Sequence, residues 1–347
     1  MTTLRNGFTT GSCAAACALA SCLWQQTGEM PDRVTLVLPD ARYVPAVHAL
    51  SPYRCAVFKD AGDDPDITDG CEVWAEVVPC DTYGPIRFHA GEGVGTVTRP
   101  GLKLPPGEAA INPVPREMIE KAVRSVFGPC AADVTVGITG GAELAKRTFN
   151  PRLGIEGGLS ILGTTGIVHP MSESAMIETV RLEMQMHRAG GANTLGLVFG
   201  SQGEQALRCL HPDLPCVQMS NFVGAALDTA ESLGISQVLL AGQPGKLVKV
   251  AGGCMQTHSQ YGDGRRETLT AHLALMGAPL SLLNQVMEAV TLDGLIPVIA
   301  DAGYSSVWSR LCESASRYAR ARTHDRVRVD TQMLDSSGSV LGGFHDP

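Results

Sequence analysis

The chain has 347 residues, of which 44% are hydrophobic and 18% are charged, as in an ordinary soluble protein with room for two domains. Its formal net charge is -8, and no run of basic residues is interleaved with aromatic residues. We therefore expect no nucleic-acid partner, and an anionic ligand would need a locally positive pocket.

The N-terminal segment MTTLRNGFTTGSCAAACALASCLW places one early Arg before a run rich in Ala and Cys. It is too short and too rich in small residues to span a membrane, and it makes a poor signal peptide. We predict a buried helix from about Gly11 to Gln26, in a cytoplasmic protein with no membrane partner.

Eleven cysteines raise the question of a disulfide framework or a metal site. No CxxC pair occurs, and Cys13 and Cys17 lie four apart on the predicted helix without a neighbouring His. Small, buried and reduced thiols explain this spacing better than zinc ligands do. We expect no protein-bound metal.

Strands are expected over 34–40, 41–50 and 72–79, followed by a Gly/Pro-rich stretch over 84–116. A compact domain keeps such a long irregular stretch only as a functional loop or a lid. A helix over 117–126 and a strand over 133–139 complete an α+β domain, to which we assign residues 1–150.

From residue 151 the sequence alternates between short apolar strands and helices. This alternation predicts a parallel sheet with helices on both faces, in a second domain over 151–347. Its ligand site is expected where loops gather at the carboxyl ends of the strands. The expected strands span 159–163, 195–200, 216–220 and 237–242, and the expected helices run to Arg188, from Gln202, and over 221–234, 245–253, 267–276 and 280–290, before a hairpin over 326–342.

Two glycine-containing turns lead directly into predicted helices. The strand over 159–163 continues into Gly163, Thr164, Thr165 and Gly166, and Ser172 then begins a helix. Backbone N–H groups at such a turn can bind a small charged ligand, although packing alone explains the pattern equally well. Thr9, Thr10 and Ser12 stand at the start of the first helix, which predicts an anion site or an ordinary N-cap.

Other motifs leave their alternatives open. Lys246 and Lys249 lie three apart at a helix start, and they are either ligand-binding or solvated lysines. The Asp-rich segment over 59–70 lacks calcium-loop spacing, so it holds either turn and cap residues or carboxylates that face a cation. His258 shares a loop with Asp263 and Arg265, but no catalytic triad follows from one loop.

Five segments in order resemble the successive blocks of the CbiD family, the cobalt-precorrin-5B C1-methyltransferases of anaerobic cobalamin biosynthesis. They are GFTTGSCAAA, KDAGDDPDITDG, GEGVGTVTRPGLKLPPGEAAINPVPR, TFNPRLGIEGGLSILGTTGIVHPMSESA and GKLVKVAGGCMQTHSQYGDGR, and they span almost the whole chain. The sequence departs from the family pattern at Ala109, where the family has Pro, and at Gln256, where it has Asn.

The resemblance implies an α+β N-terminal domain plus an α/β Rossmann-like C-terminal domain, with S-adenosylmethionine as the methyl donor. It implies a polycarboxylate tetrapyrrole as the acceptor, which carries the cobalt itself. On this reading the catalytic candidates are Asp60, Asp63, Asp64 and His258; the donor-binding candidates are Gly163, Thr164, Thr165, Gly166, Gly200, Ser201 and Glu204; and the substrate-binding candidates are Thr9, Thr10, Ser12, Arg99, Lys103, Arg116, Lys246, Lys249 and Arg265.

Two rival functions remain open at this point. One is a non-catalytic tetrapyrrole-binding or carrier protein, and the other is a small-molecule kinase, for which the sequence offers no credible nucleotide motif. Binding of S-adenosylmethionine separates the methyltransferase from both. The oligomeric state is open, a homo-oligomer included.

Overall fold

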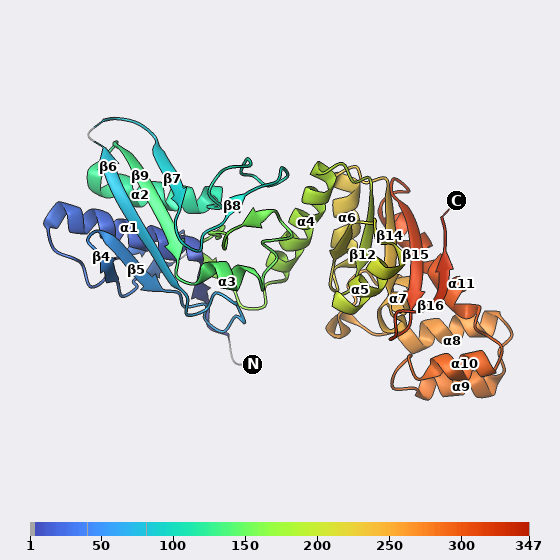
Figure 1. Cartoon of the computed structure of the whole chain (residues 1–347). Coiled ribbons are helices and arrows are strands. Elements are labelled where there is room, and N and C mark those ends of the chain that lie inside the picture. The colour runs from blue at the N-terminus through green and yellow to red at the C-terminus, as the bar shows by residue number, and fades with distance from the viewer. Residues whose placement is uncertain (1–3, 40, 81, 347) are drawn as a thin grey trace. The chain divides into compact units, whose positions relative to one another are not determined.

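The computed structural model describes residues 4–39, 41–80 and 82–346, so that Asp40, the last residue of one predicted strand, lies outside the described residues. The chain divides into two compact units, Met1–Glu173 and Ser174–Pro347 (Figure 1). We predicted the division at 150/151. It lies later because residues 155–168 pair with the N-terminal unit: β10 (Ile155–Glu156) pairs with β8 (Thr96–Val97), and β11 (Ile167–Val168) with β1 (Gly7–Phe8).

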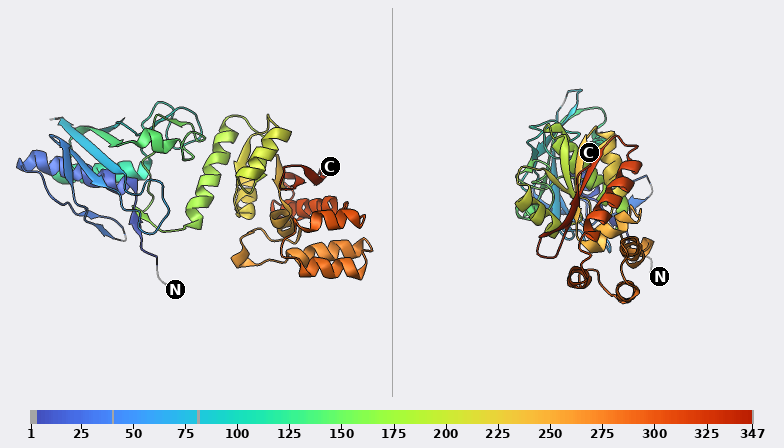
Figure 2. Two further views of the ribbon diagram at one scale, coloured as in Figure 1. Left: turned by 60° about the horizontal axis from the view of Figure 1, so that its bottom comes forward. Right: turned by 90° about the vertical axis from the view of Figure 1, so that its right-hand side faces the viewer.

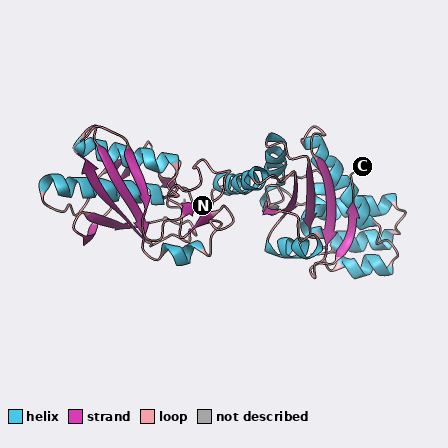
Figure 3. Cartoon of the chain, turned by 45° about the horizontal axis from the view of Figure 1, so that its top comes forward, coloured by secondary structure: helices cyan, strands magenta, loops and turns pink. Residues whose placement is uncertain are grey.

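The N-terminal unit is built on a five-stranded sheet of order β4-β5-β6-β9-β7, in which only β7 and β9 run parallel. Apolar residues of α1 and α2 pack with β5, β6 and β9 in one buried core. Figure 3 shows helices lying against this sheet. The elements of this sheet and its helices are β4 (His48–Ser51), β5 (Arg54–Phe58), β6 (Glu72–Cys80), β7 (Ile86–Ala90), β9 (Ala131–Ile138), α1 (Thr10–Thr27), α2 (Pro113–Phe127) and α3 (Gly141–Ala145), with a separate short pair of β2 (Leu36–Val37) and β3 (Arg42–Tyr43).

Helix α1 matches its prediction closely. The Thr9 side chain accepts a hydrogen bond from Ser12 N at its start, and Gly28 ends it in the left-handed conformation, with φ 81°. Its Ala and Cys residues are fully buried, so the helix lies close to its neighbours. Burial raises the pKa of the Cys13 thiol to about 11, which keeps this thiol protonated near neutral pH.

The C-terminal unit contains a second five-stranded sheet of order β13-β12-β14-β15-β16, parallel except for the edge strand β16. The strands are β12 (Thr194–Val198), β13 (Cys216–Gln218), β14 (Gln237–Gly242), β15 (Arg328–Leu334) and β16 (Val340–Phe344), and the helices are α4 (Glu173–Ala189), α5 (Ser201–Leu210), α6 (Val223–Ser232), α7 (Pro244–Ala251), α8 (Arg265–Leu275), α9 (Leu280–Glu288), α10 (Leu295–Asp301) and α11 (Val307–Arg322), with a 3-10 turn at Ser259–Tyr261. The predicted alternation and the C-terminal hairpin are therefore present.

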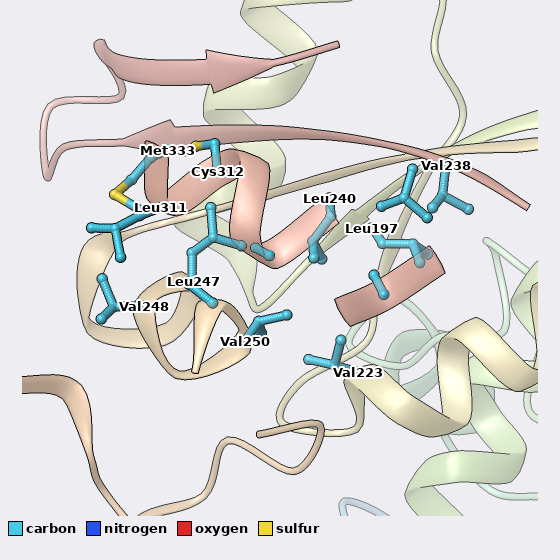
Figure 4. Close-up of a cluster of buried hydrophobic side chains, with 14 of the residues drawn as sticks. Leu197, Val223, Val238, Leu240, Leu247, Val248, Val250, Leu311, Cys312 and Met333 are labelled. Atoms are coloured by element: carbon cyan, nitrogen blue, oxygen red, sulfur yellow. The ribbon is translucent and has the colours of Figure 1, made fainter. Parts of the chain in front are cut away.

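The two faces of this sheet are covered unequally. Side chains of α4, α6, α7 and α11 pack on one face together with Leu197, Val238 and Leu240, as Figure 4 shows for part of this core. On the other face, Leu207 of α5 packs against Val198 and Ala241 in a much smaller cluster. Helices α8, α9 and α10 lie together as a group (Figure 2).

Two expectations about elements were wrong, and several further elements were not predicted. The stretch 159–163 is not a strand of the parallel sheet, because Leu159 and Ile161 form isolated bridges to Val94 and Ile111 in the N-terminal unit. Strand β7 lies within the stretch that we expected to be a loop, and β5 was not predicted. Helices α10 and α11 were also missed.

Candidate functional site

The carboxyl edge of the C-terminal sheet brings two helix starts together. Strand β12 leads into α5 through Gly200, and β14 leads into α7 through Gln243. These strands are neighbours, while their following helices pack on opposite faces, which makes this a topological switch point. The Gln243 side chain donates to Gln202 Oε1 at 3.3 Å, so the two turns adjoin.

The start of α5 is open for a ligand. Gly200 is extended, with φ -178°, and a β-carbon placed on it would meet no atom within 4 Å. The backbone N–H of Glu204 closes the first helical turn onto the Gly200 carbonyl at 3.0 Å, which leaves the N–H groups of residues 201–203 without helical acceptors. Such a helix start attracts an anionic group, and donor binding by Gly200 and Ser201 stays a prediction.

Glu204 holds the elements of this edge together. Its carboxylate accepts hydrogen bonds from Arg208 at 2.7 Å and from the side chain of Gln218, which ends β13. Its side chain is 7% exposed. The pairing with two protein donors explains this burial, so a ribose contact by Glu204 is not needed to account for its position.

Asn221 links three segments on the same edge, and we did not predict its role from the sequence. Its Oδ1 accepts from Lys246 Nζ at 2.7 Å and from Thr257 Oγ1 at 3.0 Å. The preceding residue, Ser220, has φ +52°, a conformation that side-chain-bearing residues rarely adopt. Strained backbone of this kind clusters at functional sites.

The three predicted cations of this region have different surroundings. Lys249 is buried, and its ammonium donates to the carbonyls of Thr257 and Gly262 at 3.2 and 3.0 Å, which fixes the loop after α7. Arg265 forms an ion pair with Asp263 at 2.5 Å, and this hydrogen bond is the main cause that lowers the pKa of Asp263 to about 2.

Lys246 is the cation of the three whose side-chain partner is a neutral amide. Desolvation lowers its pKa, and the nearby charges of Lys249 and Arg265 lower it further. His258, in the same region, accepts from Gln260 N at 3.2 Å through Nδ1, so this contact caps the short turn that follows. Lys246 is therefore the best placed of these residues to exchange its partner for an anionic ligand.

The turn over 163–166 lies in the N-terminal unit and packs on the start of α1. The predicted donor site at the C-terminal sheet therefore does not include it, because residues 159–168 pair with N-terminal strands instead. Ser12 Oγ donates to the Gly166 carbonyl at 2.6 Å, and Thr10 Oγ1 accepts from Leu162 N at 2.9 Å. Thr9, Thr10 and Ser12 thus dock this turn, and Thr164 and Thr165 lie within it.

The Asp-rich turn has protein partners for its carboxylates. Asp60 forms an ion pair with Arg5 at 2.5 Å, and the Arg5 hydrogen bond is the first cause that lowers the pKa of Asp60. Asp63 accepts from Arg5 N at 2.6 Å, and Asp64 accepts from Met171 N at 2.9 Å. These contacts match the turn-and-cap alternative, and a catalytic role for the three residues stays a prediction.

The predicted cations of the N-terminal unit also separate into two kinds. Arg116 donates to Glu108 at 2.8 Å and to the Ile111 carbonyl at 2.8 Å, so it fastens the long loop before α2. Arg99 and Lys103 are exposed on that loop. They form no ion pair with any residue of the described chain, and they are thus available to an anion.

Across residues 4–39, 41–80 and 82–346, no group of three or more His, Cys, Asp or Glu side chains is arranged to hold a metal ion. No helix in the described part of the chain has the length and apolar composition that a bilayer crossing requires.

The chain is similar in sequence to known proteins of one family. Residues 1–170 match the sequence model of CbiD, and residues 256–343 match that of the CbiD C-terminal domain. A protein of Alkaliphilus metalliredigens is 41% identical over 97% of this chain and 92% of its own length, and one of Photorhabdus laumondii is 43% identical over 97% and 92%. Both are named cobalt-precorrin-5B C(1)-methyltransferase.

A crystal structure of a cobalamin biosynthesis protein (cbiD) from Archaeoglobus fulgidus is 28% identical in sequence, covers 76% of this chain and 84% of its own, and has a TM-score of 0.40. The relatives at more than 40% identity align with nearly the whole of this chain and of their own length. The chain belongs to the CbiD family.

Proposed function

We propose that this protein transfers a methyl group from S-adenosylmethionine to C-1 of cobalt-precorrin-5B, giving cobalt-precorrin-6A in the anaerobic assembly of the corrin ring. The observation that carries the proposal is the alignment of nearly the whole chain, at 41% and 43% identity, with relatives named for this reaction. Because this alignment covers residues of both units, the resemblance includes the residues proposed to bind the donor and those proposed to bind the acceptor.

We assign donor binding to the C-terminal unit, as a Rossmann-like domain. The switch point between β12 and β14 is the position at which open α/β sheets bind ligands. Gly200 leaves space there, and the N–H groups of residues 201–203 offer an anion site for the carboxylate of the donor's methionine part.

The donor supplies a methyl group on a sulfonium, which is electrophilic without further activation. The residues of the chain then have two tasks, to align the acceptor carbon with that methyl and to exclude water from the path between them. Neither task requires a strong acid or base. This agrees with a sheet edge at which Glu204 and Asp263 are paired with arginines and Lys246 faces a neutral amide.

The acceptor carries acetate and propionate groups, so it requires cations. Lys246 faces a neutral amide on the C-terminal unit, and Arg99 and Lys103 are exposed on the N-terminal unit. Guanidinium and ammonium groups bind carboxylates by charge-assisted hydrogen bonds. The cobalt belongs to the substrate.

A methyl-labelled donor incubated with the protein and cobalt-precorrin-5B tests the proposal. We expect label in the tetrapyrrole, and NMR of the product should place it on C-1. A carrier protein would bind the tetrapyrrole without binding the donor, so calorimetry with S-adenosylmethionine alone separates the two functions. Absence of both label transfer and donor binding would refute the proposal. The cytoplasmic location stays a prediction.

A further inference from the structure

Two loops of the N-terminal unit are fastened to each other by backbone hydrogen bonds. Strands β8 and β10 pair, and beyond them Thr98 N donates to the Gly154 carbonyl at 2.7 Å. The second loop is closed on itself, because Ile155 N donates to the Asn150 carbonyl at 3.0 Å. Residues 97–103 and 147–155 therefore form one ordered surface, which we call the loop pair.

The loop pair carries an excess of positive charge on a chain whose net charge is -8. Arg99, Lys103 and Arg147 are exposed, and within the described chain none of the three forms an ion pair. Arg152 is half-buried, and its guanidinium lies over the Phe149 ring at 5.6 Å from the centroid. Arg99, Lys103 and Arg147 repel one another because none of them has a carboxylate partner, so an anionic ligand is expected to stabilise this surface.

Gly154 sets the position of Arg99. It has φ +64°, and a β-carbon placed on it would lie 2.8 Å from the Cβ and Cγ of Arg99. The aliphatic part of the Arg99 side chain therefore lies against the backbone of the opposite loop, in space that only glycine leaves free. A guanidinium held in this way loses less freedom when it binds a carboxylate, and its planar fork suits two-point contact.

We propose that the loop pair, through Arg99, Lys103 and Arg147, binds carboxylate side chains of the tetrapyrrole acceptor. Phe149, 43% exposed beside Arg152, supplies an apolar surface for the ring periphery between these carboxylates. The inference rests on the proposed function for the identity of the acceptor. It adds Arg147 to the predicted substrate-binding residues, and it predicts that the N-terminal unit binds an acceptor with several carboxylates more tightly than one with few.

The test compares Arg99→Gln, Arg147→Gln and the double variant with Lys146→Gln as the matched control. Lys146 is adjacent to Arg147 and is also exposed, but it already forms an ion pair with Glu143 at 2.6 Å. The probe is uroporphyrin III, which has eight carboxylates. Its binding is measured by fluorescence titration at two salt concentrations. Coproporphyrin III, with four carboxylates, serves as the less charged partner of the same ring size.

We expect the double variant to bind uroporphyrin at least tenfold more weakly than wild type, with a smaller salt dependence and a smaller loss for coproporphyrin. Lys146→Gln should stay within twofold of wild type. In the methyl-transfer assay the double variant should show a KM for the acceptor raised at least tenfold, with kcat and donor affinity nearly unchanged.

An unchanged affinity and an unchanged KM in the double variant would overturn the inference, as would an equal loss in Lys146→Gln, which would indicate a diffuse charge effect. The inference would also be overturned if the wild-type protein bound neither of the two porphyrins nor the acceptor. The proposed function fails separately, if wild-type protein binds these ligands and transfers no methyl group.

Discussion

Helices α1 and α5 begin in similar ways and differ in what lies in front of them. Each follows a residue with extended backbone, and each start was predicted to bind a ligand, an anion at α1 and the methyl donor at α5. At α1, Gly11 N donates to the Leu162 carbonyl at 2.8 Å, and the hydroxyls of Thr10 and Ser12 bind the same turn. At α5, the Gly200 position is open. A helix start binds ligand only where its N–H groups are not already used by the chain.

This difference assigns separate roles to two turns that look alike in sequence. The Gly163–Gly166 turn binds to the start of α1 and stabilises the N-terminal unit, while donor binding at the Gly200–Ser201 turn stays a prediction. Substitutions at equivalent positions of the two turns should therefore give opposite results, one in stability and the other in binding.

The largest expected effect comes from Gly163→Val. Gly163 has φ +143°, and a β-carbon there would overlap the Thr9 side chain. Backbone strain and overpacking together should lower the free energy of unfolding by at least about 3 kcal/mol, which thermal and urea unfolding would measure. The matched change, Gly200→Ala, should alter stability by less than about 0.5 kcal/mol and weaken donor binding at least tenfold, about 1.4 kcal/mol.

Calorimetry with S-adenosylmethionine on both variants decides between the two turns. A folded Gly163→Val protein of wild-type stability that no longer binds donor would return the donor site to the N-terminal turn. A Gly200→Ala protein with wild-type donor affinity would remove the site from α5.

Ser12→Ala and Ser201→Ala make the same comparison with hydroxyl groups. Ser12 is fully buried, and its Oγ donates to the Gly166 carbonyl at 2.6 Å. Loss of this hydrogen bond should lower the free energy of unfolding by about 1–3 kcal/mol. Ser201 is exposed, so its loss should leave the unfolding midpoint in place and weaken donor binding several-fold. Equal midpoints for the two variants would contradict the assigned roles.

The sequence predicted the elements that repeat a strong local pattern. The alternation over 194–242 and the capped helix α1 are visible as apolar periodicity with Thr9 and Gly28 at the ends. Gly200 and Ser201 could be predicted to lie at the carboxyl edge of the sheet because the rule for open α/β sheets depends only on strand and helix order; their donor role stays a prediction. These features are local, so one stretch of sequence contains their full signal.

The rest depends on partners that are distant in sequence. Whether LSILG pairs with a parallel sheet or with Val94 and Ile111 is decided by long-range packing, and a short apolar run is compatible with both. The role of Asn221 depends on Lys246 and Thr257, which come from two later segments. No spacing rule connects these three residues.

Asp63→Asn tests the smaller contacts of the N-terminal unit. Asp63 and Arg5 exchange two hydrogen bonds, from Arg5 N to the carboxylate at 2.6 Å and from Asp63 N to the Arg5 carbonyl at 2.9 Å. Asn keeps the acceptor and loses the charge, so we expect a loss of about 0.5–2 kcal/mol in stability and a change in kcat below threefold. A stable variant with turnover reduced tenfold would instead support the catalytic role predicted from the sequence.

The smallest expected effect is a pH dependence caused by Lys246. It tests whether the sheet edge beside α5 also contacts the acceptor. The pKa of Lys246 lies below the ordinary value of 10.5 because the folded protein desolvates it beside Lys249 and Arg265. If its ammonium binds a substrate carboxylate, acceptor affinity should fall as the pH rises through this lowered pKa, at a lower pH than for an ordinary lysine.

The free energy of unfolding should change in the opposite direction. Between the lowered pKa of the folded protein and the ordinary pKa of the unfolded chain, the unfolded chain binds more protons, so stability rises with pH. Lys246→Arg keeps the charge and should remove both dependences below pH 10.5. Acceptor titrations and urea unfolding from pH 7.5 to 10.5 measure the two slopes, and an affinity slope that persists in Lys246→Arg would assign the titration to another group.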